Sequence, residues 1–363
     1  MNIAWFTHRD MGHPQAGGVG RTIHEVGKRL AQRGHSFNVV SVGWKESKNL
    51  EEIDGIYVRR LRNNLIAHLY ATKLLKEISP DMVVDDLGHA VPWFSDISTS
   101  QPGTVFFHHL HRRSLKGQVS LPLRYVISGI ELLYPIIYRT WPFVTESISS
   151  FDDLVNLGID ESRITRILPG VDTDFYKPRD KEDAPTIVYF GGFRDYKRPW
   201  EVIYCVKDLF QEFDNLRLVM IGSGPSLDKT KGIAKSLGLY GRISFLGKIS
   251  DMELVDVVSG SWLNIHTSTT EGYGFSILEA SACGVPTIAY AVPGIIESIE
   301  NANNGFLIQD GNRKQMGETI ANFLRSYESS WVKKSRNVAL KYSWNETANQ
   351  WEGHLWKTIE RNY

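Results

Sequence analysis

The sequence predicts an α/β fold made of two Rossmann-like domains, each with a parallel sheet that is covered by helices on both faces. Three observations support this prediction. The chain has 363 residues, more than a single hydrophobic core usually organises, and this length is typical of about two domains. Short runs rich in β-branched residues alternate with helix-length segments in both halves. The halves are separated by residues 168–185, LPGVDTDFYKPRDKEDAP, which are rich in proline, glycine and charge.

The composition is that of an ordinary globular protein. Hydrophobic residues make up 42% of the chain, charged residues make up 23%, and the formal net charge is zero. This balance gives no reason to expect a nucleic-acid partner. Cys205 and Cys283 lie far apart, which argues for a reducing compartment and against a disulfide scaffold or a zinc site. The N-terminus lacks the basic and long apolar regions of a signal peptide, so we expect a cytoplasmic protein.

The first half begins with a strand over 2–8, a glycine-rich loop and a helix over 21–32. Ile23, Val26 and Leu30 recur at helical spacing and predict the buried face of that helix. Further strands are expected at 36–43, 56–61, 81–86 and 103–109, with a helix near 69–78.

The second half repeats the pattern. Strands are expected at 186–193, 216–224, 242–247, 263–268 and 286–292, with helices between them, the first over 199–213. The last stretch, from Ser343, is predicted to be helical. We therefore expect domains of residues 1–170 and 171–345, and a C-terminal helix, 346–363, that packs back on the first domain. Ligands of such folds bind where parallel strands end, at the switch point of the sheet.

One strand–loop–helix segment of the second half carries two carboxylates. Glu271 lies in the loop and Glu279 lies one turn into a helix that is expected to begin at Phe275. Gly272 and Gly274 let the backbone approach a ligand. The helix N-terminus suits a phosphate, and a carboxylate one turn later can accept hydrogen bonds from two vicinal hydroxyls, as on a ribose. From local physics alone, a joint with two solvated glutamates explains the segment equally well.

A second element of this half is basic. Pro199 suits the first position of a helix, which places Lys197 and Arg198 at the helix N-terminus. The helix dipole disfavours cations there, so a bound anion is favoured over a purely structural role. A third element, MIGSGPSLD, contains Gly222 and Gly224 and is either a tight strand–helix turn or a loop that contacts a ligand.

The spacing of Glu271 and Glu279 resembles the E-x7-E motif of the GT4-type retaining glycosyltransferases. The match continues on both sides, with HTS-x-x-EG before it, LEA-x-ACG-x-P around it and VPGIIESI after it. LPGVDTDFYKP resembles the interdomain signature of the same family, and the resemblance covers essentially the whole chain. It implies a GT-B fold, with two parallel sheets facing across a cleft. The first domain would then bind the acceptor and the second the nucleotide sugar.

The resemblance also implies roles for individual residues. Glu279 would hold the nucleotide ribose, Glu271 would face the donor sugar, and Lys197 would neutralise the departing diphosphate. The family's usual arginine is replaced here by Gly192, and Arg194 is our candidate to reach the same phosphate. Other residues expected to bind the donor are Gly222 and Gly224 beside the base, and Gly272, Tyr273, Gly274 and Phe275 around the first glutamate.

Two features of the first half are candidates for the same site. Gly17 and Gly18, with Arg21, resemble half of a dinucleotide fingerprint, but the next strand lacks the acidic end that a dehydrogenase needs. The family resemblance implies instead that this loop borders the donor phosphates. It also places a histidine at the end of the strand GTVFFHH, in contact with the donor sugar. His108 is our choice, and His109 is the close alternative.

We expect neither a metal nor a cofactor. The cluster of His108, His109 and His111 lacks a clear carboxylate or cysteine partner in the sequence. The acidic pairs at 85–86 and 152–153 are interpreted as solvated turns or helix caps. The resemblance implies sugar transfer from a UDP- or GDP-linked donor, with retention of configuration by a front-face path, in polysaccharide or glycolipid biosynthesis. A sugar-nucleotide epimerase of similar fold is the alternative.

Residues 121–143 combine apolar, aromatic and basic side chains, interrupted by proline. No run reaches the roughly 20 apolar residues of a spanning helix. The segment fits either a membrane interface or a buried helix pair, and periodicity does not separate them. Many similar enzymes act on lipid-linked acceptors. We therefore favour peripheral contact through 112–143 at the inner membrane face, with a glycan, lipid-linked or other hydroxyl acceptor.

Overall fold

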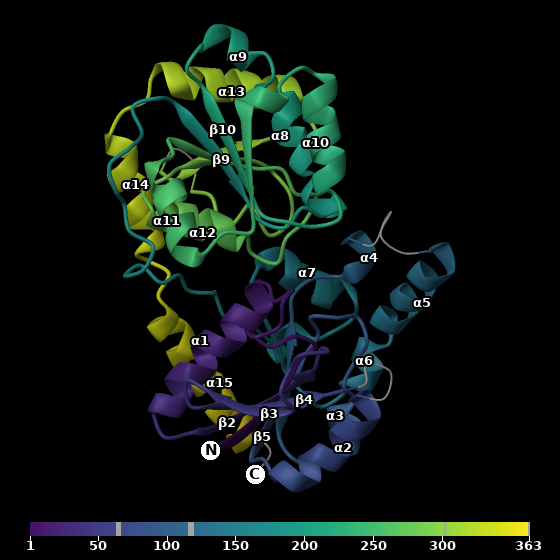
Figure 1. Ribbon diagram of the computed structural model, residues 1–363. Helices are drawn as coiled ribbons and strands as arrows, with labels where there is room; N and C mark the ends of the chain where they lie inside the picture. The colour runs from purple at the N-terminus through teal and green to yellow at the C-terminus, as the bar shows by residue number, and fades with distance from the viewer. Residues whose placement is uncertain (63–66, 115–119, 301–302, 362–363) are drawn as a thin grey trace. The chain divides into compact units, whose positions relative to one another are not determined.

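A computed structural model describes residues 1–62, 67–114, 120–300 and 303–361. The chain forms two compact units (Figure 1). Unit 1 contains Met1–Gly170 together with Trp344–Tyr363, and unit 2 contains Val171–Ser343. Within the described ranges, no helix is both long enough and apolar enough to cross a membrane.

Unit 1 is built on a sheet of eight strands in the order β3-β4-β2-β1-β5-β6-β7-β8. Every neighbouring pair is parallel except the antiparallel pair of β3 and β4. The strands are β1 (Asn2–Phe6), β2 (Ser36–Val42), β3 (Leu50–Ile53), β4 (Ile56–Leu61), β5 (Met82–Asp86), β6 (Gly103–Phe107), β7 (Phe143–Thr145) and β8 (Ile164–Arg166). The direction of strand addition reverses between β1 and β5, which makes their carboxyl ends the switch point of this sheet.

Both faces of this sheet are buried, as parallel sheets require. Along β1, Ala4 and Phe6 belong to one hydrophobic cluster, whereas Ile3 and Trp5 belong to the other, because successive side chains of a strand point to opposite faces. The helices of unit 1 are α1 (Gly18–Gln32), α2 (Ala67–Ile78), α3 (Ser95–Ser98), α4 (His111–Ser114), α5 (Leu121–Leu132), α6 (Tyr134–Ile137), α7 (Ile148–Asn156) and α15 (Trp344–Glu360).

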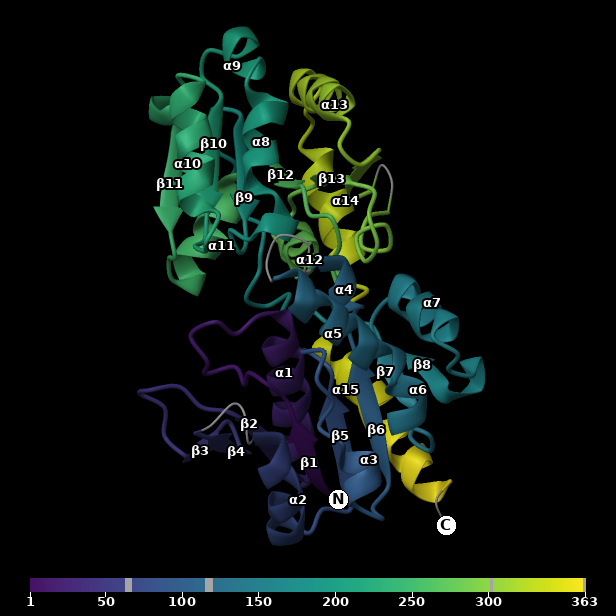
Figure 2. The same ribbon diagram turned by 90° about the vertical axis from the view of Figure 1, so that its right-hand side faces the viewer.

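The last helix, α15, packs beside α1 in unit 1 (Figures 1 and 2). Nε of Arg29 donates to the side-chain oxygen of Asn345 at 2.8 Å. The rings of Trp351 and Trp5 lie 4.7 Å apart between their centroids, so α15 buries one face of the central strand. The helix therefore completes the core of the unit to which the N-terminus belongs.

Unit 2 is built on a six-stranded sheet in the order β11-β10-β9-β12-β13-β14, in which every neighbouring pair is parallel. Its strands are β9 (Thr186–Phe190), β10 (Arg217–Ile221), β11 (Ile243–Gly247), β12 (Leu263–His266), β13 (Thr287–Tyr290) and β14 (Gly305–Ile308). Strand addition reverses between β9 and β12, so the loops after these two strands lie at the switch point.

The helices of unit 2 begin largely where the sequence predicts. They are α8 (Pro199–Val206), α9 (Leu209–Glu212), α10 (Leu227–Ser236), α11 (Asp251–Gly260), α12 (Phe275–Ala282), α13 (Arg313–Arg325) and α14 (Ser330–Ala339). Pro199 is the first helical residue of α8 and Phe275 is the first of α12, as predicted. The helix predicted over 199–213 is wrong in one respect, because it is divided into α8 and α9.

The prediction of two α/β domains with parallel sheets is confirmed. The strands that the sequence did not predict, β3, β7, β8 and β14, have only three or four residues each. Runs of that length carry too little alternation to be separated from loops. The first helix begins at Gly18 and not at Arg21, because Gly17 is its N-cap residue.

Candidate active site

The loops after β9 and β12 are joined by hydrogen bonds at the switch point of unit 2. The Thr267 hydroxyl lies 3.1 Å from the carbonyl oxygen of Lys197 and 3.0 Å from that of Arg198. The Thr269 amide donates to the carbonyl oxygen of Tyr196 at 2.7 Å. Two loops that are far apart in the sequence are thereby held as one structure.

These loops bring Lys197 and Glu271 into an ion pair. Nζ of Lys197 lies 2.8 Å from Oε1 of Glu271, and the Ser268 hydroxyl donates to the same carboxylate at 2.6 Å. The side chains are only 20% and 12% exposed. Burial alone would lower the pKa of Lys197, but the Glu271 charge overrides it and raises that pKa. Likewise, burial opposes ionisation of Glu271, yet the Lys197 charge holds its pKa below the usual value. Both residues are therefore charged at neutral pH.

His266 is a further side chain beside Glu271, and it was not predicted as a site residue from the sequence. It ends β12, and its Nε2 lies 3.5 Å from Oε1 of Glu271. Burial lowers its pKa to about 4, and the charges of Lys197 and Arg198 act in the same direction. The ring is therefore neutral. The signal was present in the sequence, since His266 opens the HTS-x-x-EG segment.

Arg198 does not serve the anion site that its position suggested. Its guanidinium donates to the carbonyl oxygens of Thr267 at 2.8 Å and Ser268 at 2.9 Å, and it also forms an ion pair with Asp310. It lies 5.0 Å from the centre of the Tyr290 ring. The prediction of a basic pair facing an anion is therefore wrong for Arg198, whose donors hold the β12 loop against α8.

The glycines of this site mainly permit close packing of loops. A Cβ at Gly222 would lie 1.9 Å from the carbonyl oxygen of Gly191, and one at Gly224 would lie 2.5 Å from that of Phe193. Gly274 caps α12 with φ of +82°, in the left-handed region that favours glycine. These contacts fix the loops around the carboxylates before any ligand is considered.

Glu279 and Arg194 occupy the same end of the sheet. Glu279, on α12, is half-buried and accepts a hydrogen bond from the Tyr176 hydroxyl at 3.1 Å. Arg194 precedes a short 3-10 turn, Asp195–Lys197. A Cβ at Gly192 would lie 3.8 Å from the Arg194 side chain, so Arg194 fills the space beside the position where the family has arginine.

The aromatic residues around Glu271 differ in exposure. The side chain of Tyr273 is buried, with its ring 6.0 Å from that of Tyr342, so it does not face a ligand. Phe275 is half-buried at the start of α12. Gly272, which separates Glu271 from Tyr273 in the sequence, is also half-buried. The residues predicted for the donor in unit 2 therefore gather at one end of one sheet, but the Tyr273 side chain belongs to the core.

In unit 1, His108 lies between two carboxylates. Its Nε2 is 2.6 Å from Oδ1 of Asp86 and its Nδ1 is 3.1 Å from Oε2 of Glu146. The ring is 3% exposed. Burial alone would lower the pKa of His108, but the charge and hydrogen bond of Asp86, with those of Glu146, raise it to about 9. The buried ring is therefore an imidazolium that donates from both nitrogens.

This geometry corrects two interpretations of the sequence. The pair Asp85 and Asp86 is not a solvated turn, because both side chains are buried. Nor does the histidine cluster lack carboxylates, since Asp86 and Glu146 are brought to His108 by the fold. Even so, the described part of the chain contains no group of three or more His, Cys, Asp or Glu residues that could hold a metal ion. Both ring nitrogens of His108 already have carboxylate partners. Contact of His108 with a sugar stays a prediction.

His109, the alternative to His108, is half-buried, and its ring lies 5.0 Å from that of His111. Gly17 and Gly18 stand at the start of α1, followed by half-buried Arg21. A Cβ at Gly17 would meet nothing within 4 Å. The packing therefore leaves open space at Gly17, whereas a Cβ at Gly20, in the first turn of α1, would lie 3.3 Å from the carbonyl oxygen of Arg9.

A cavity of about 460 Å³ lies at the switch point of unit 1. It is lined by residues that follow the central strands, among them His8, Arg9, His13, Trp44, Lys45 and His89. These residues come from three separate loops and match no motif, so the sequence alone does not predict them as a site.

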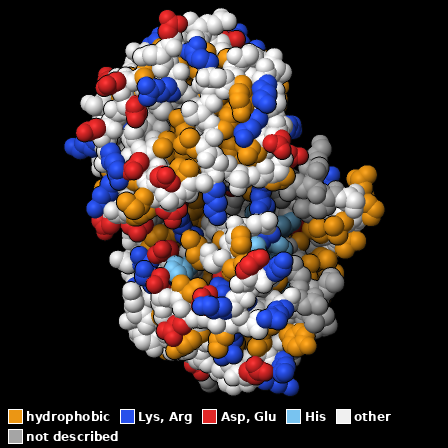
Figure 3. All heavy atoms as spheres, in the orientation of Figure 1, with side chains coloured by type: hydrophobic (Ala, Val, Ile, Leu, Met, Phe, Trp, Pro, Cys, Tyr) orange, Lys and Arg blue, Asp and Glu red, His pale blue; other side chains and the backbone are white. Residues whose placement is uncertain are grey.

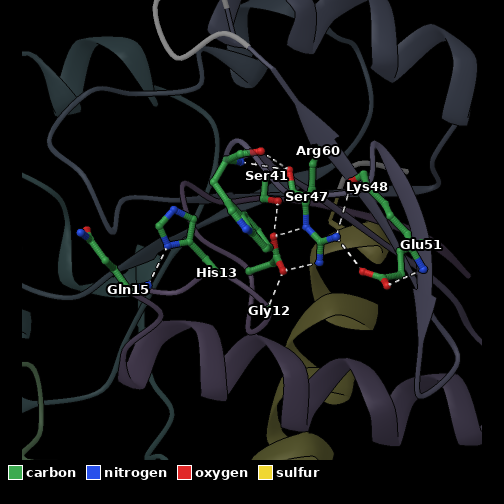
Figure 4. Close-up of polar contacts among 10 residues, drawn as sticks. Gly12, His13, Gln15, Ser41, Ser47, Lys48, Glu51 and Arg60 are labelled. Atoms are coloured by element: carbon green, nitrogen blue, oxygen red, sulfur yellow. Dashed lines mark hydrogen bonds and ion pairs between the residues drawn. The ribbon is translucent and has the colours of Figure 1, made fainter. Parts of the chain in front are cut away.

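A buried ion pair close to Trp44 of the lining connects residues of three strands (Figure 4). Arg60, on β4, donates to Asp10 from Nε at 2.9 Å and from NH2 at 2.8 Å. Asp10 also accepts from the Ser41 hydroxyl on β2 at 2.6 Å and from the Gly12 amide at 2.9 Å. NH1 of Arg60 donates to Glu51 on β3 at 2.7 Å. The network fixes the loop after β1 against the sheet.

The segment 121–143 forms part of a projecting surface and part of the core. Tyr134, Tyr138 and Trp141 are buried, so the hypothesis of a membrane interface is wrong for these three aromatics. In contrast, α5 exposes a row of large apolar side chains, which Figure 3 shows as an orange area at the right-hand edge. The exposed residues of α5 and α6 are Leu121, Leu123, Tyr125, Val126, Leu132 and Ile136. Residues 115–119, including the basic Lys116, lie outside the described ranges.

Two family matches divide the chain between them. Residues 16–175 match the family described as Glycosyltransferase Family 4, and residues 171–338 match that described as Glycosyl transferases group 1. The chain belongs to glycosyltransferase family 4. The resemblance inferred from the sequence is confirmed at this level.

Curated relatives of this family 4 protein include two bacterial enzymes. The D-inositol 3-phosphate glycosyltransferase of Rhodococcus jostii is 30% identical over 242 residues, which are 61% of this chain. The match spans about half, 53%, of that relative's length. The N-acetyl-alpha-D-glucosaminyl L-malate synthase of Bacillus anthracis is 22% identical over 348 residues, 87% of each protein.

Solved structures with the same fold cover nearly all of this family 4 chain. Sucrose-phosphate synthase from Thermosynechococcus elongatus has a TM-score of 0.83 at 18% identity, over 99% of both chains. Anabaena Alr3699/HepE in complex with UDP-glucose has a TM-score of 0.79 at 18% identity, over 98% of this chain and 99% of that one. The predicted GT-B fold is confirmed by these likenesses.

Proposed function

We propose that this chain is a retaining glycosyltransferase that moves a sugar from a UDP- or GDP-linked donor to a hydroxyl acceptor. The observation that carries the proposal is the set of Lys197, Glu271 and Glu279 at the carboxyl ends of β9 and β12, beside the N-terminus of α12. Ligands of α/β sheets bind at such switch points. The relative in complex with UDP-glucose supports a UDP-linked donor.

In this proposal, Lys197 and Arg194 hold the diphosphate together with the N-terminal amides of α12. Glu279 accepts hydrogen bonds from the two ribose hydroxyls, and the Tyr176 hydroxyl keeps its carboxylate in place. Glu271 accepts from hydroxyls of the donor sugar. Lys197 also offsets the negative charge that grows on the leaving phosphate, which is electrostatic stabilisation of the transition state.

Transfer proceeds on the face of the sugar that the diphosphate leaves. The bond between the anomeric carbon and the phosphate oxygen breaks, and the acceptor oxygen forms its new bond on the same side. The acceptor hydroxyl gives its proton to the departing diphosphate, so no protein nucleophile is consumed. The protein contributes positioning and charge stabilisation, and the anomeric configuration is retained.

The test is a thermal-shift panel of UDP, GDP and ADP with their sugar conjugates, followed by a transfer assay with the best donor. A ligand that binds only the folded state raises stability by about 2.7 kcal/mol at one hundred times its dissociation constant. One nucleotide series is expected to stabilise the chain, and Glu279→Ala is expected to remove the effect. Stabilisation by none of them would refute the donor site. Conversion of the sugar without any acceptor would support the epimerase instead.

We further propose that the protein is cytoplasmic and that α5 makes peripheral contact with the anionic surface of the inner membrane face. Tyr125 is 76% exposed and Val126 is 57% exposed. The acidic residue of α5, Glu131, is buried and accepts from the His111 amide, so it does not repel an anionic surface. Apolar side chains without exposed acids suit the headgroup region.

A further inference from the structure

The cavity of unit 1 lies where an α/β sheet offers its binding site. His8 follows β1, Trp44 follows β2 and His89 follows β5, and strand order reverses between β1 and β5. The cavity is therefore formed by loops at the carboxyl ends of parallel strands, at the switch point. A volume of about 460 Å³ is enough for a small hydroxylated molecule.

The charges on the cavity wall favour an anion. Arg9 and Lys45 are cations in the lining, and Glu46 is the acidic residue of the lining. The nearby Asp10 contributes no free negative charge, because Arg60 pairs with it through two hydrogen bonds. The formal charge of the lining is therefore positive.

The ion-pair network of Arg60, which contacts the lining residue Trp44, is neutral overall. Arg60 contacts Glu51 as well as Asp10, and Nζ of Lys48 lies 3.5 Å from Glu51 (Figure 4). Two cations thus balance two carboxylates. The guanidinium of Arg60 also lies 4.8 Å from the centre of the Trp44 ring, so the same network supports the aromatic wall.

Two histidines of the lining have defined tautomers when they are neutral. The backbone N–H of Gln15 donates to Nδ1 of His13 at 3.0 Å (Figure 4). The proton of the neutral His13 ring is therefore on Nε2, which is a donor. The carbonyl oxygen of Gly88 lies 2.8 Å from Nδ1 of His89 and only accepts, so that ring carries its proton on Nδ1. Its Nε2 is then an acceptor. The lining thus offers donors for an anion and one acceptor for a hydroxyl.

The electrostatic environment of His8 also favours an anionic ligand. Its ring lies 3.9 Å from that of His89 between centroids. Burial lowers the pKa of His8 to about 2, and the neighbouring His89, His68, Arg9 and His111 act in the same direction. These four neighbours are histidines and an arginine, so Glu46 is the carboxylate of the lining that a ligand's negative charge would meet.

We propose that this cavity binds the acceptor substrate through an anionic group, a phosphate monoester or a carboxylate carried by a small hydroxylated molecule. Arg9, Lys45 and Nε2–H of His13 hold the anion, and Nε2 of His89 accepts a hydrogen bond from a hydroxyl. The inference rests on the proposed function, since it names the chemical class of the acceptor.

The test compares three probes of similar size: glycerol, glycerate and glycerol 3-phosphate. Binding to the full chain is measured from the histidine ring signals by NMR, in the presence of saturating UDP or GDP so that the diphosphate site is filled. At least one anionic probe is expected to bind ten-fold or more tightly than glycerol, because hydrogen bonds to charged groups are the stronger ones. Preference for glycerate assigns a carboxylate, and preference for glycerol 3-phosphate assigns a phosphate.

Variants connect the preference to the cavity. Arg9→Gln and Lys45→Gln are each expected to weaken anion binding by about ten-fold, while glycerol binding and nucleotide binding remain. Arg9→Lys should restore part of the loss. Lys73→Gln, at an exposed position of α2, is the matched control and should change nothing.

Equal binding of all three probes, or a preference that survives Arg9→Gln and Lys45→Gln together, would overturn the inference and leave the donor site intact. Inorganic phosphate that binds as tightly as glycerol 3-phosphate would overturn recognition of the hydroxyl. Anion binding by a chain that binds no nucleotide would instead contradict the proposed function, and with it the assignment of the anion as an acceptor.

Discussion

Nζ of Lys197 lies 2.8 Å from Oε1 of Glu271, and this pair joins the loops that follow the two central strands of unit 2. Because removal of one partner leaves the other charge in a largely buried place, each single change should cost roughly 3 kcal/mol of stability. Lys197→Gln should also lower the transfer rate by about 10²–10³-fold, since it removes a cation that faces the leaving phosphate. Urea unfolding and a transfer assay measure the two effects.

An exposed pair in the same unit provides the comparison. Nζ of Lys314 and Oε1 of Glu318 lie 3.9 Å apart on α13, and both side chains are mostly exposed. Lys314→Gln should change stability by less than about 1 kcal/mol and leave transfer unchanged. Equal effects of Lys197→Gln and Lys314→Gln would contradict a special role for the buried pair.

Glu279 is expected to govern affinity for the nucleotide. Glu279→Gln removes the charge but keeps the shape, and it should weaken nucleotide binding by about 10–100-fold through the loss of charged hydrogen bonds to the ribose. Tyr176→Phe, which removes the hydroxyl 3.1 Å from Glu279, should weaken binding by less than ten-fold. Calorimetry with the nucleotide and its 2′,3′-dideoxy analogue separates the effects. If Glu279→Gln loses as much affinity for the analogue as for the nucleotide, the ribose contact is wrong.

The donor segment was predictable because its parts are close together in the sequence. Glu271, Gly274 and Phe275 lie within a few residues of one another, and their strand, loop and helix follow from local rules. Arg198 was misinterpreted because its partners, Ser268 and Asp310, lie 70 and 112 residues away. Helix position indicated that a cation needed an anion, but it did not indicate which carbonyls and carboxylate the fold would bring to it.

Gly274 is expected to be essential for the start of α12. Its φ is +82°, and a Cβ would lie 2.7 Å from Cδ1 of Ile295. Gly274→Ala should therefore destabilise unit 2 by roughly 1–3 kcal/mol through backbone strain and overlap. Gly232→Ala, at an open position within α10, should be neutral or stabilising by up to about 1 kcal/mol. Thermal unfolding that ranks the two variants in the opposite order would disprove this assignment.

His108 is expected to link stability to pH. Its pKa in the folded chain is raised to about 9, whereas a histidine in an unfolded chain has a pKa of about 6.5. The stabilisation is therefore complete below pH 6.5 and is lost as pH rises from 6.5 through 9. Unfolding free energy should fall over that interval by roughly 1–3 kcal/mol more than in His108→Gln. NMR titration of the ring should show the imidazolium still present at pH 7.5.

Parallel pH dependence in the two proteins, or a neutral His108 ring at pH 7.5, would show that the carboxylates do not hold the proton there.

The sequence contained no reliable sign of the arrangement around His108. Asp86 and Glu146 lie 22 and 38 residues from His108, and each ends or follows a different strand. For Arg60, in contrast, a signal existed. It lies on the same face of β4 as the buried Ile56 and Val58, so the period of two predicts a core-facing arginine that needs a partner.

Contact of α5 with membrane predicts binding to vesicles. Tyr125→Glu with Val126→Glu should lower co-sedimentation with anionic vesicles by about ten-fold, since the two changes add negative charge and remove apolar surface. Met252→Glu, at an exposed apolar residue of unit 2, is the control. If the wild-type chain stays in the supernatant of anionic vesicles at low salt, the membrane proposal is contradicted, and the donor site is unaffected.

The position of α15 has a consequence for the order in which the chain folds during synthesis. Unit 1 receives Trp344–Glu360 only after all of unit 2 has been made. Until then, the side of β1 that carries Trp5 has no Trp351 to cover it. Unit 2 is continuous in sequence and can acquire its structure while the ribosome is still translating, whereas the first unit to emerge is the last to be completed. A premature stop after Ser343 would therefore damage the N-terminal unit and spare the one next to the stop.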